Sequence, residues 1–276
     1  MKIMIGKFLL NNIFLKSLRD YLKSFSWWSL GLFLTVIMIM AIYPTMKDAQ
    51  GLNDFLASMP KEMINLWVQN VEDADITSPE GFLNAELFTV MLPVIFIIFA
   101  INIGKGAVSG EESSGTLEMV LSNPVSRVSF LIQKIYSLLF LVISLGFILA
   151  ISGYFGMTIF DIELAKGNFF WACTSLVLLG LLFGSISLFL GSYFGRSMIA
   201  VSVSASIALL AYLINALVPL VEGIKWMQQG SPFYWYFGHD PLRNGIDFAH
   251  LSMFVVTIAV LFILAIYFFK DRDLRV

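Results

Sequence analysis

Six long stretches without a single Asp, Glu, Lys or Arg constrain the fold of this chain more than any other feature. They cover residues 24–46, 87–104, 135–160, 167–195, 197–221 and 251–269, and each contains at least 18 residues. A helix needs about 20 apolar residues to cross the hydrocarbon core of a bilayer. It also satisfies its own backbone hydrogen bonds, for which lipid offers no partners. The stretches therefore predict an all-α integral membrane protein with six transmembrane helices.

The composition excludes several other classes of protein. Of the 276 residues, 58% are hydrophobic and only 13% are charged, compared with about 25% charged residues in ordinary soluble domains. The net charge of −2 provides no basic face for nucleic acid. The single cysteine, Cys173, lies in an apolar stretch, so neither an intramolecular disulfide nor a cysteine metal cluster can form.

The basic residues predict the orientation in the membrane, because cytoplasmic segments carry an excess of Lys and Arg. Twelve of the 17 basic residues fall on the side of the two termini, and five fall on the opposite side. Both termini are therefore expected in the cytoplasm. The longest outer loop, residues 45–83, is expected to hold a short amphipathic helix after Pro60.

Residues 1–25 form an amphipathic segment ahead of the first span. Phe14, Leu18 and Phe25 share one arc of a helical wheel, whereas Lys16 and Arg19 share the other. This pattern predicts a helix lying in the cytoplasmic interface, followed by a six-helix transmembrane domain at residues 26–276. The alternative interpretation is a partly ordered basic tail.

The segment at residues 105–128, between the second and third spans, is the longest cytoplasmic connection. Glu111 and Glu112 precede an apolar helical turn that contains Leu117 and Leu121, and acidic residues suit the positive end of a helix dipole. Pro124 ends this helix. A helix that merely covers the bundle would favour lysine at an anionic leaflet, so the acids indicate a docking element for a soluble partner.

Few motifs in the sequence indicate catalysis, nucleotide binding or metal binding. The spans contain no deep charged residue of the kind that marks ion-coupled carriers. The stretch from Gly110 to Thr116 has the glycine spacing of a P-loop, but it lacks the phosphate-binding lysine. No metal site and no catalytic residue are predicted, since the four candidate ligands have no suitable helical spacing. These four are His239, Asp240, Asp247 and His250.

Small residues recur at four-residue spacing in the fourth span, where they allow helix backbones to approach closely. The candidate packing positions are Gly180, Gly184, Gly191 and Gly195. Packing within one subunit and packing between subunits both remain possible for them.

Four stretches carry a resemblance to a known family. The sequence GEESSGTLEMVLSNPVSR at residues 110–127 resembles the signature of ABC type-2 permeases, although Ser114 stands where a basic residue is often seen. The stretches SPEGFLNAELF (78–88) and SPFYWYFGHDPLRNGIDFAH (231–250) are similar to one branch of that family. The tail RDL (272–274) also fits.

The resemblance implies the membrane permease subunit of an ABC exporter in the cytoplasmic membrane of a bacterial cell. It implies pairing with a second permease subunit, as a homodimer, and with two copies of a separate ATPase that binds ATP and Mg²⁺. This chain would then be no enzyme and would hold no cofactor. Its substrate would belong to the family's range of drugs, peptide antibiotics, lipid-linked glycans and ions.

The same resemblance makes residues 105–128 the element that couples the ATPase to the bundle. The candidate coupling residues are Glu111, Glu112, Gly115, Thr116, Leu117, Glu118, Leu121, Pro124 and Arg127. Two other functions remain open: a non-transporting membrane scaffold or sensor, and an ion-coupled secondary transporter, which the charge-free spans disfavour.

Overall fold

The computed structural model describes residues 12–47, 77–121, 125–221 and 223–272. Within these ranges the chain is helical and contains no strand. Six of the described segments are long and apolar enough to cross a membrane. The predicted all-α fold with six transmembrane helices is therefore confirmed. The helix expected after Pro60 lies outside the described residues.

The membrane-length segments coincide with the six charge-free stretches. The first is α2 (Ile13–Lys47). The second is composite and consists of α5 (Pro79–Leu83), η2 (Asn84–Phe88), α6 (Met91–Lys105), η3 (Gly106–Gly110) and α7 (Glu111–Ser113). The other four are α9 (Arg127–Ile159), α10 (Lys166–Phe194), α11 (Ser197–Leu217) with η4 (Val218–Leu220), and α14 (Phe248–Asp271). Shorter helices connect them: α8 (Thr116–Leu121) at one end of the bundle, and η5 (Lys225–Gly230), α12 (Pro232–Phe237) and α13 (Pro241–Asn244) toward the other.

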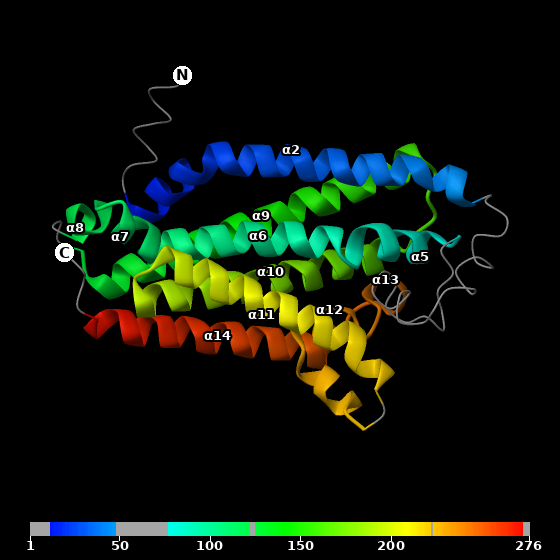
Figure 1. Ribbon diagram of the computed structural model, residues 1–276. Helices are drawn as coiled ribbons and strands as arrows, with labels where there is room; N and C mark the ends of the chain where they lie inside the picture. Colours follow the sequence, from blue (N-terminus) through cyan, green and yellow to red (C-terminus); the bar gives the residue numbers. More distant parts are fainter. Residues whose placement is uncertain (1–11, 48–76, 122–124, 222, 273–276) are drawn as a thin grey trace, which may run out of the picture.

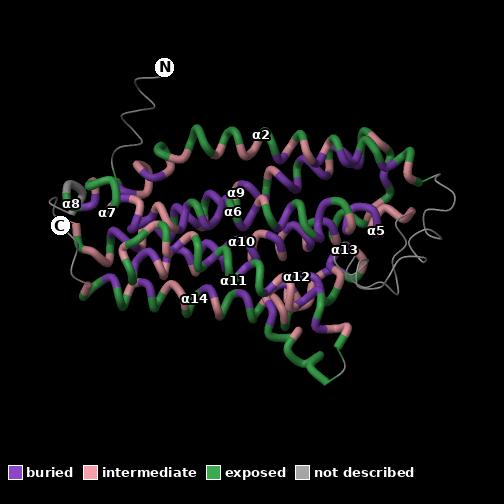
Figure 2. Tube along the Cα trace, viewed as in Figure 1, coloured by how far each residue is buried: buried purple, intermediate pink, exposed green. Residues whose placement is uncertain are grey.

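The helices run side by side, with α2 along one edge of the bundle and α14 along the opposite edge (Figure 1). The central helix α10 packs against α6, α9, α11 and α14. Buried residues concentrate on the inner helices, whereas the outer sides of α2 and α14 are exposed (Figure 2). The exposed residues there are largely apolar, including Leu34, Met38 and Ile263. Such surfaces suit contact with lipid.

The glycines of the fourth span bring α10 close to α6. A methyl group on Gly104 of α6 would lie 2.3 Å from the backbone oxygen of Gly184. A methyl group on Gly180 would meet Phe96 at 3.3 Å, and one on Gly191 would meet Ser109 at 3.0 Å. Within this chain, Gly180 and Gly184 thus pack against α6, and Gly191 packs against η3. Gly195 ends α10 instead, in the left-handed conformation with φ of 66°.

The second span is interrupted near its N-terminal end. Ser78 caps its N-terminus, because its side chain accepts a hydrogen bond from the backbone N–H of Gly81 at 3.2 Å. The π-helical turn η2 is followed by a break at Thr89 and Val90, and α6 begins at Met91. Pro93 lies in the first turn of α6, where its missing N–H and its ring disfavour continuation of the preceding helix. The break in the helix therefore falls just before the proline.

The first helix includes part of the predicted interfacial segment at residues 1–25. Residues 1–11 of that segment lie outside the described part of the chain, and residues 13–25 belong to the continuous helix α2. At 1.5 Å per residue, its 35 residues extend for about 52 Å, which exceeds the roughly 30 Å hydrocarbon core. The partly buried side chains of Leu18, Tyr21 and Phe25 pack against the core of the bundle, while Arg19 and Lys23 are exposed. The amphipathic pattern thus reflects packing against neighbouring helices.

Candidate functional site

The segment between the second and third spans forms a compact helical turn at one end of the bundle. The π-helical turn η3 leads directly into α7, and the chain reverses at Ser114 and Gly115 before α8 (Figure 1). The backbone N–H of Gly115 donates to the carbonyl of Glu112 at 3.1 Å, and that of Ser114 donates to the carbonyl of Gly110 at 3.1 Å. Gly115 has φ of 67°, a conformation that favours glycine.

Glu111 lies at the centre of a buried polar cluster. Its carboxylate accepts a hydrogen bond from Lys134 of α9 at 2.7 Å and another from Lys16 of α2 at 3.2 Å. The hydroxyl of Thr116 also donates to it, which folds α8 back toward α7. Lys134 is only 4% exposed. It therefore forms an ion pair inside the bundle.

Glu112 faces a different partner, Arg272 at the end of α14. The guanidinium of Arg272 donates to the Glu112 carboxylate and also to the backbone carbonyls of Gly191 at 3.2 Å and Ser192 at 2.9 Å. These carbonyls belong to the last turn of α10, and that of Gly191 also accepts a hydrogen bond from the backbone N–H of Gly195 at 3.0 Å. A cation also suits the negative end of that helix. Arg272 therefore caps α10 while it pairs with Glu112.

Arg127 adds a second link to the end of the chain. It is the first residue of α9, and its guanidinium donates to the backbone carbonyl of Arg272 at 2.6 Å. Gly195 lies beside the same cluster, because a methyl group on it would come within 2.8 Å of the Arg272 guanidinium and 2.7 Å of the Glu112 carboxylate. The beginning of α9 and the ends of α10 and α14 thus meet around these residues.

The remaining candidate coupling residues divide between buried and exposed positions. Leu117 is 1% exposed and joins the core of the bundle, whereas Gly115 and Glu118 are exposed. Leu121 ends α8, and Pro124 lies outside the described residues. Glu111 and Glu112 thus pair with basic side chains of the chain itself, and Leu117 packs in its core. Their role in coupling stays a prediction.

Sequence reasoning missed the basic partners of the two glutamates. Lys134 offered a signal, because a lysine inside an apolar helix requires a compensating group. Its partner Glu111 lies 23 positions earlier in the chain, farther away than Glu118, so sequence distance does not identify the pair. Arg272 was noted only as part of the RDL tail. Its pairing with Glu112 depends on how α14 packs against α10, which local sequence does not encode.

The other two motifs meet at the opposite end of the bundle. The side-chain amide of Asn84 donates to Asp240 at 2.9 Å, and the hydroxyl of Tyr236 donates to the backbone carbonyl of Phe88 at 2.9 Å. Burial raises the pKa of the Tyr236 hydroxyl well above its usual value, so it remains a hydrogen-bond donor at neutral pH. The four resembling stretches thus form two polar clusters, one at each end.

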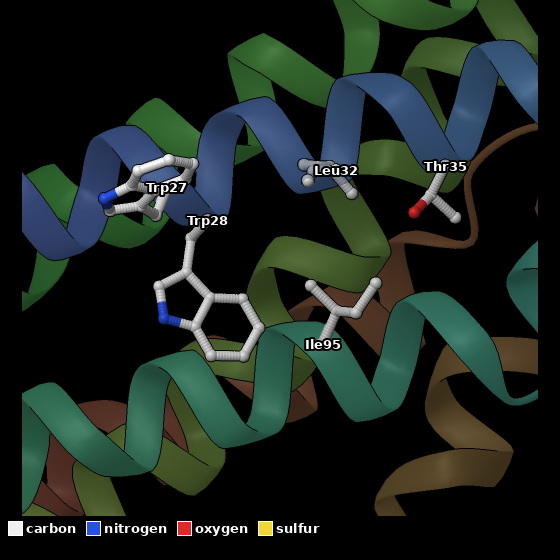
Figure 3. Close-up of a pocket in the computed structure, with 6 residues that line it drawn as sticks. Trp27, Trp28, Leu32, Thr35 and Ile95 are labelled. Atoms are coloured by element: carbon white, nitrogen blue, oxygen red, sulfur yellow. The ribbon is translucent and has the colours of Figure 1, made fainter.

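Two apolar hollows flank α6. One, of about 310 Å³, lies between α6 and α11 and is lined by Pro93, Ala208 and Tyr212 among others. The second, also of about 310 Å³, lies between α2 and α6. Figure 3 shows Trp27 and Trp28 of α2 and Ile95 of α6 at its walls. The described residues contain no cluster of three or more potential metal-binding side chains.

This architecture defines the class: a multi-pass membrane protein whose polar clusters lie at the ends of an apolar helical bundle. Residues 11–274, nearly the whole chain, match a family described as ABC-2 family transporter protein. The chain belongs to this family. Among curated proteins, no sequence matches it significantly.

Proposed function

We propose that the chain is the permease subunit of an ATP-driven ABC exporter and that residues 105–128 dock a separate ATPase subunit. The observation that carries this proposal is the hairpin of α7 and α8, which extends from the second span and is fixed to the bundle by buried ion pairs. A firmly anchored element with an exposed tip can receive a force at the tip and pass it to the helices. Membership of the ABC-2 transporter family supports the same role.

The exposed part of this element is the proposed contact surface. Ser113, Ser114, Gly115 and Glu118 are exposed around the chain reversal. Glu111, Glu112 and Leu117 would then anchor the element instead of touching the ATPase. ATP and Mg²⁺ would be bound by the ATPase, in two copies, in a complex with two copies of this chain in the cytoplasmic membrane of a bacterium.

The substrate path is proposed to run along the face that α6 shares with its neighbours. The hollow between α6 and α11 is almost entirely apolar, and α11 exposes Val203, Ile207 and Leu209. A second copy placed against this face would enclose the hollow between the two bundles. An apolar or amphipathic substrate would suit such a lining, because it contains no charged side chain.

The proposal is tested by purifying the chain from its own cells and identifying co-purified proteins that contain a P-loop. Glu118→Lys reverses an exposed charge on the proposed surface and should reduce ATPase recovery, since charge reversal at an interface opposes association. Asp271→Lys, an exposed acid at the end of α14, is the matched control and should not reduce it. Undiminished recovery with Glu118→Lys would exclude this surface, and absence of any ATPase would exclude the function.

A further inference from the structure

Two adjacent glutamates connect the docking element to different helices. Glu111 pairs with Lys16 of α2 and Lys134 of α9. Glu112 pairs with Arg272, which also binds the last turn of α10. The packing of the bundle follows the same division, since α2 packs chiefly against α9, and α14 chiefly against α10.

The backbone explains how neighbouring residues reach opposite groups of helices. Successive residues of a helix point about 100° apart, so the two carboxylates leave α7 in different directions. Both belong to the three-residue helix α7, which is continuous with η3 and closed by the turn at Gly115. Displacement of this short helix must therefore displace both ion pairs together.

Both ion pairs are buried, which protects them from screening by salt in the cell. The side chains of Lys134 and Glu111 are 4% and 10% exposed, and those of Arg272 and Glu112 are 14% and 8% exposed. Salt screens buried pairs much less than surface pairs. Removal of one partner would leave a charge in an environment that solvates it poorly, so each pair resists separation when the element moves.

We infer that Glu111 and Glu112 are positioning residues that transmit displacement of the docking element along two separate branches. Glu111 connects it to α2 and α9, and Glu112 connects it through Arg272 to α10 and α14. This inference rests on the proposed function only in taking residues 105–128 as the element that the ATPase displaces. The two mechanical links themselves are properties of this chain.

Distances between spin labels test the two branches directly. One nitroxide is placed at exposed Ser113, and the second at Lys23 of α2 or Tyr267 of α14, both of which are exposed. The full-length protein carries Cys173→Ala and is diluted with unlabelled chains in lipid nanodiscs, so that only distances within one chain are measured. Glu111→Gln and Glu112→Gln are compared with Asp271→Asn, which removes an exposed charge at the same end.

We expect Glu112→Gln to shift and broaden the distance distribution from residue 113 to 267 while that from 113 to 23 is unchanged. Glu111→Gln should have the opposite effect, and Asp271→Asn should change neither distribution. Arg272→Gln provides a second variant of the Glu112 branch and should act like Glu112→Gln. Equal broadening of both distributions in every variant, or no change in either, would overturn the inference.

ATPase recovery separates this inference from the proposed function. If the unmodified chain co-purifies with an ATPase but the variants show no separation of the two distances, only the two-branch transmission fails. If the distances separate as expected but no ATPase is recovered, the mechanical links stand and the proposed function fails.

Discussion

Glu112 and Arg272 form an ion pair although 160 positions separate them in the sequence. The pair joins the end of the second span to the end of the sixth, and Arg272 simultaneously caps the fourth through the carbonyls of Gly191 and Ser192. Three helices that are distant in sequence are therefore fixed to one another by a single guanidinium.

Lys134→Met should destabilise the protein strongly. It leaves the buried carboxylate of Glu111 without its closest basic partner. Loss of one member of a buried ion pair costs roughly 3 kcal/mol or more. The double variant Glu111→Leu with Lys134→Met removes both charges and should recover much of that loss. Thermal unfolding in detergent measures both. A single variant as stable as the unmodified protein would contradict the role of this pair.

Gly104→Ala should lower stability because its methyl group would overlap the backbone oxygen of Gly184, 2.3 Å away. Forcing extra volume into a packed core costs about 1–3 kcal/mol. Gly31→Ala is the matched control, since nothing lies within 4 Å of the added methyl group. The unfolding temperatures of the two variants measure the difference in stability. Equal temperatures would show that α6 and α10 leave room for a methyl group at Gly104.

Tyr236→Phe should remove the hydrogen bond to the Phe88 carbonyl and cost about 1 kcal/mol. The raised pKa of Tyr236 means that the folded protein retains this proton at a pH where the unfolded chain loses it. The stabilisation that the Tyr236 hydroxyl contributes is therefore fully present below about pH 10 and is lost as the pH rises further. Thermal unfolding between neutral and alkaline pH should show a smaller alkaline loss for Tyr236→Phe. Exposed Tyr267→Phe is the control.

Orientation in the membrane can be tested with impermeant maleimide on intact cells. A cysteine in place of exposed His239 should react, whereas cysteines in place of Ser113 and Asp271 should not, because the basic residues predict that the latter face the cytoplasm. The native Cys173 is buried and serves as an internal negative control. Reaction at Ser113 in sealed cells would reverse the orientation and remove the basis for ATPase docking.

The sequence alone predicts the parts of this fold that depend on local physics. Charge-free stretches determine the six spans because a charge in the bilayer core is costly. The Ser78 cap also depends on nearby residues only. By contrast, the inward orientation of Leu117 and the continuity of the first helix depend on tertiary packing. An amphipathic pattern shows that one face of a helix is apolar, but not whether that face meets lipid or protein.

The candidate site was predictable in position but not in orientation. Acids beside an apolar turn marked residues 105–128 as unusual, and the structure places a defined hairpin there. The sequence could not reveal that Glu111 and Glu112 face inward, because their basic partners come from the first, third and sixth spans. Long-range pairs of this kind are determined only when all the helices are assembled.

The π-helical turn η3 lies immediately before the two glutamates. A π-turn accommodates one more residue than an α-helical turn does. Deletion of a single residue between 106 and 110 would therefore convert it to an ordinary α-helical turn and leave both carboxylates facing their basic partners. Deletion of a single residue from the regular helix α6 would instead rotate everything beyond it by about 100° and turn both carboxylates away. A relative that lacks the extra residue of η3 can therefore retain both ion pairs.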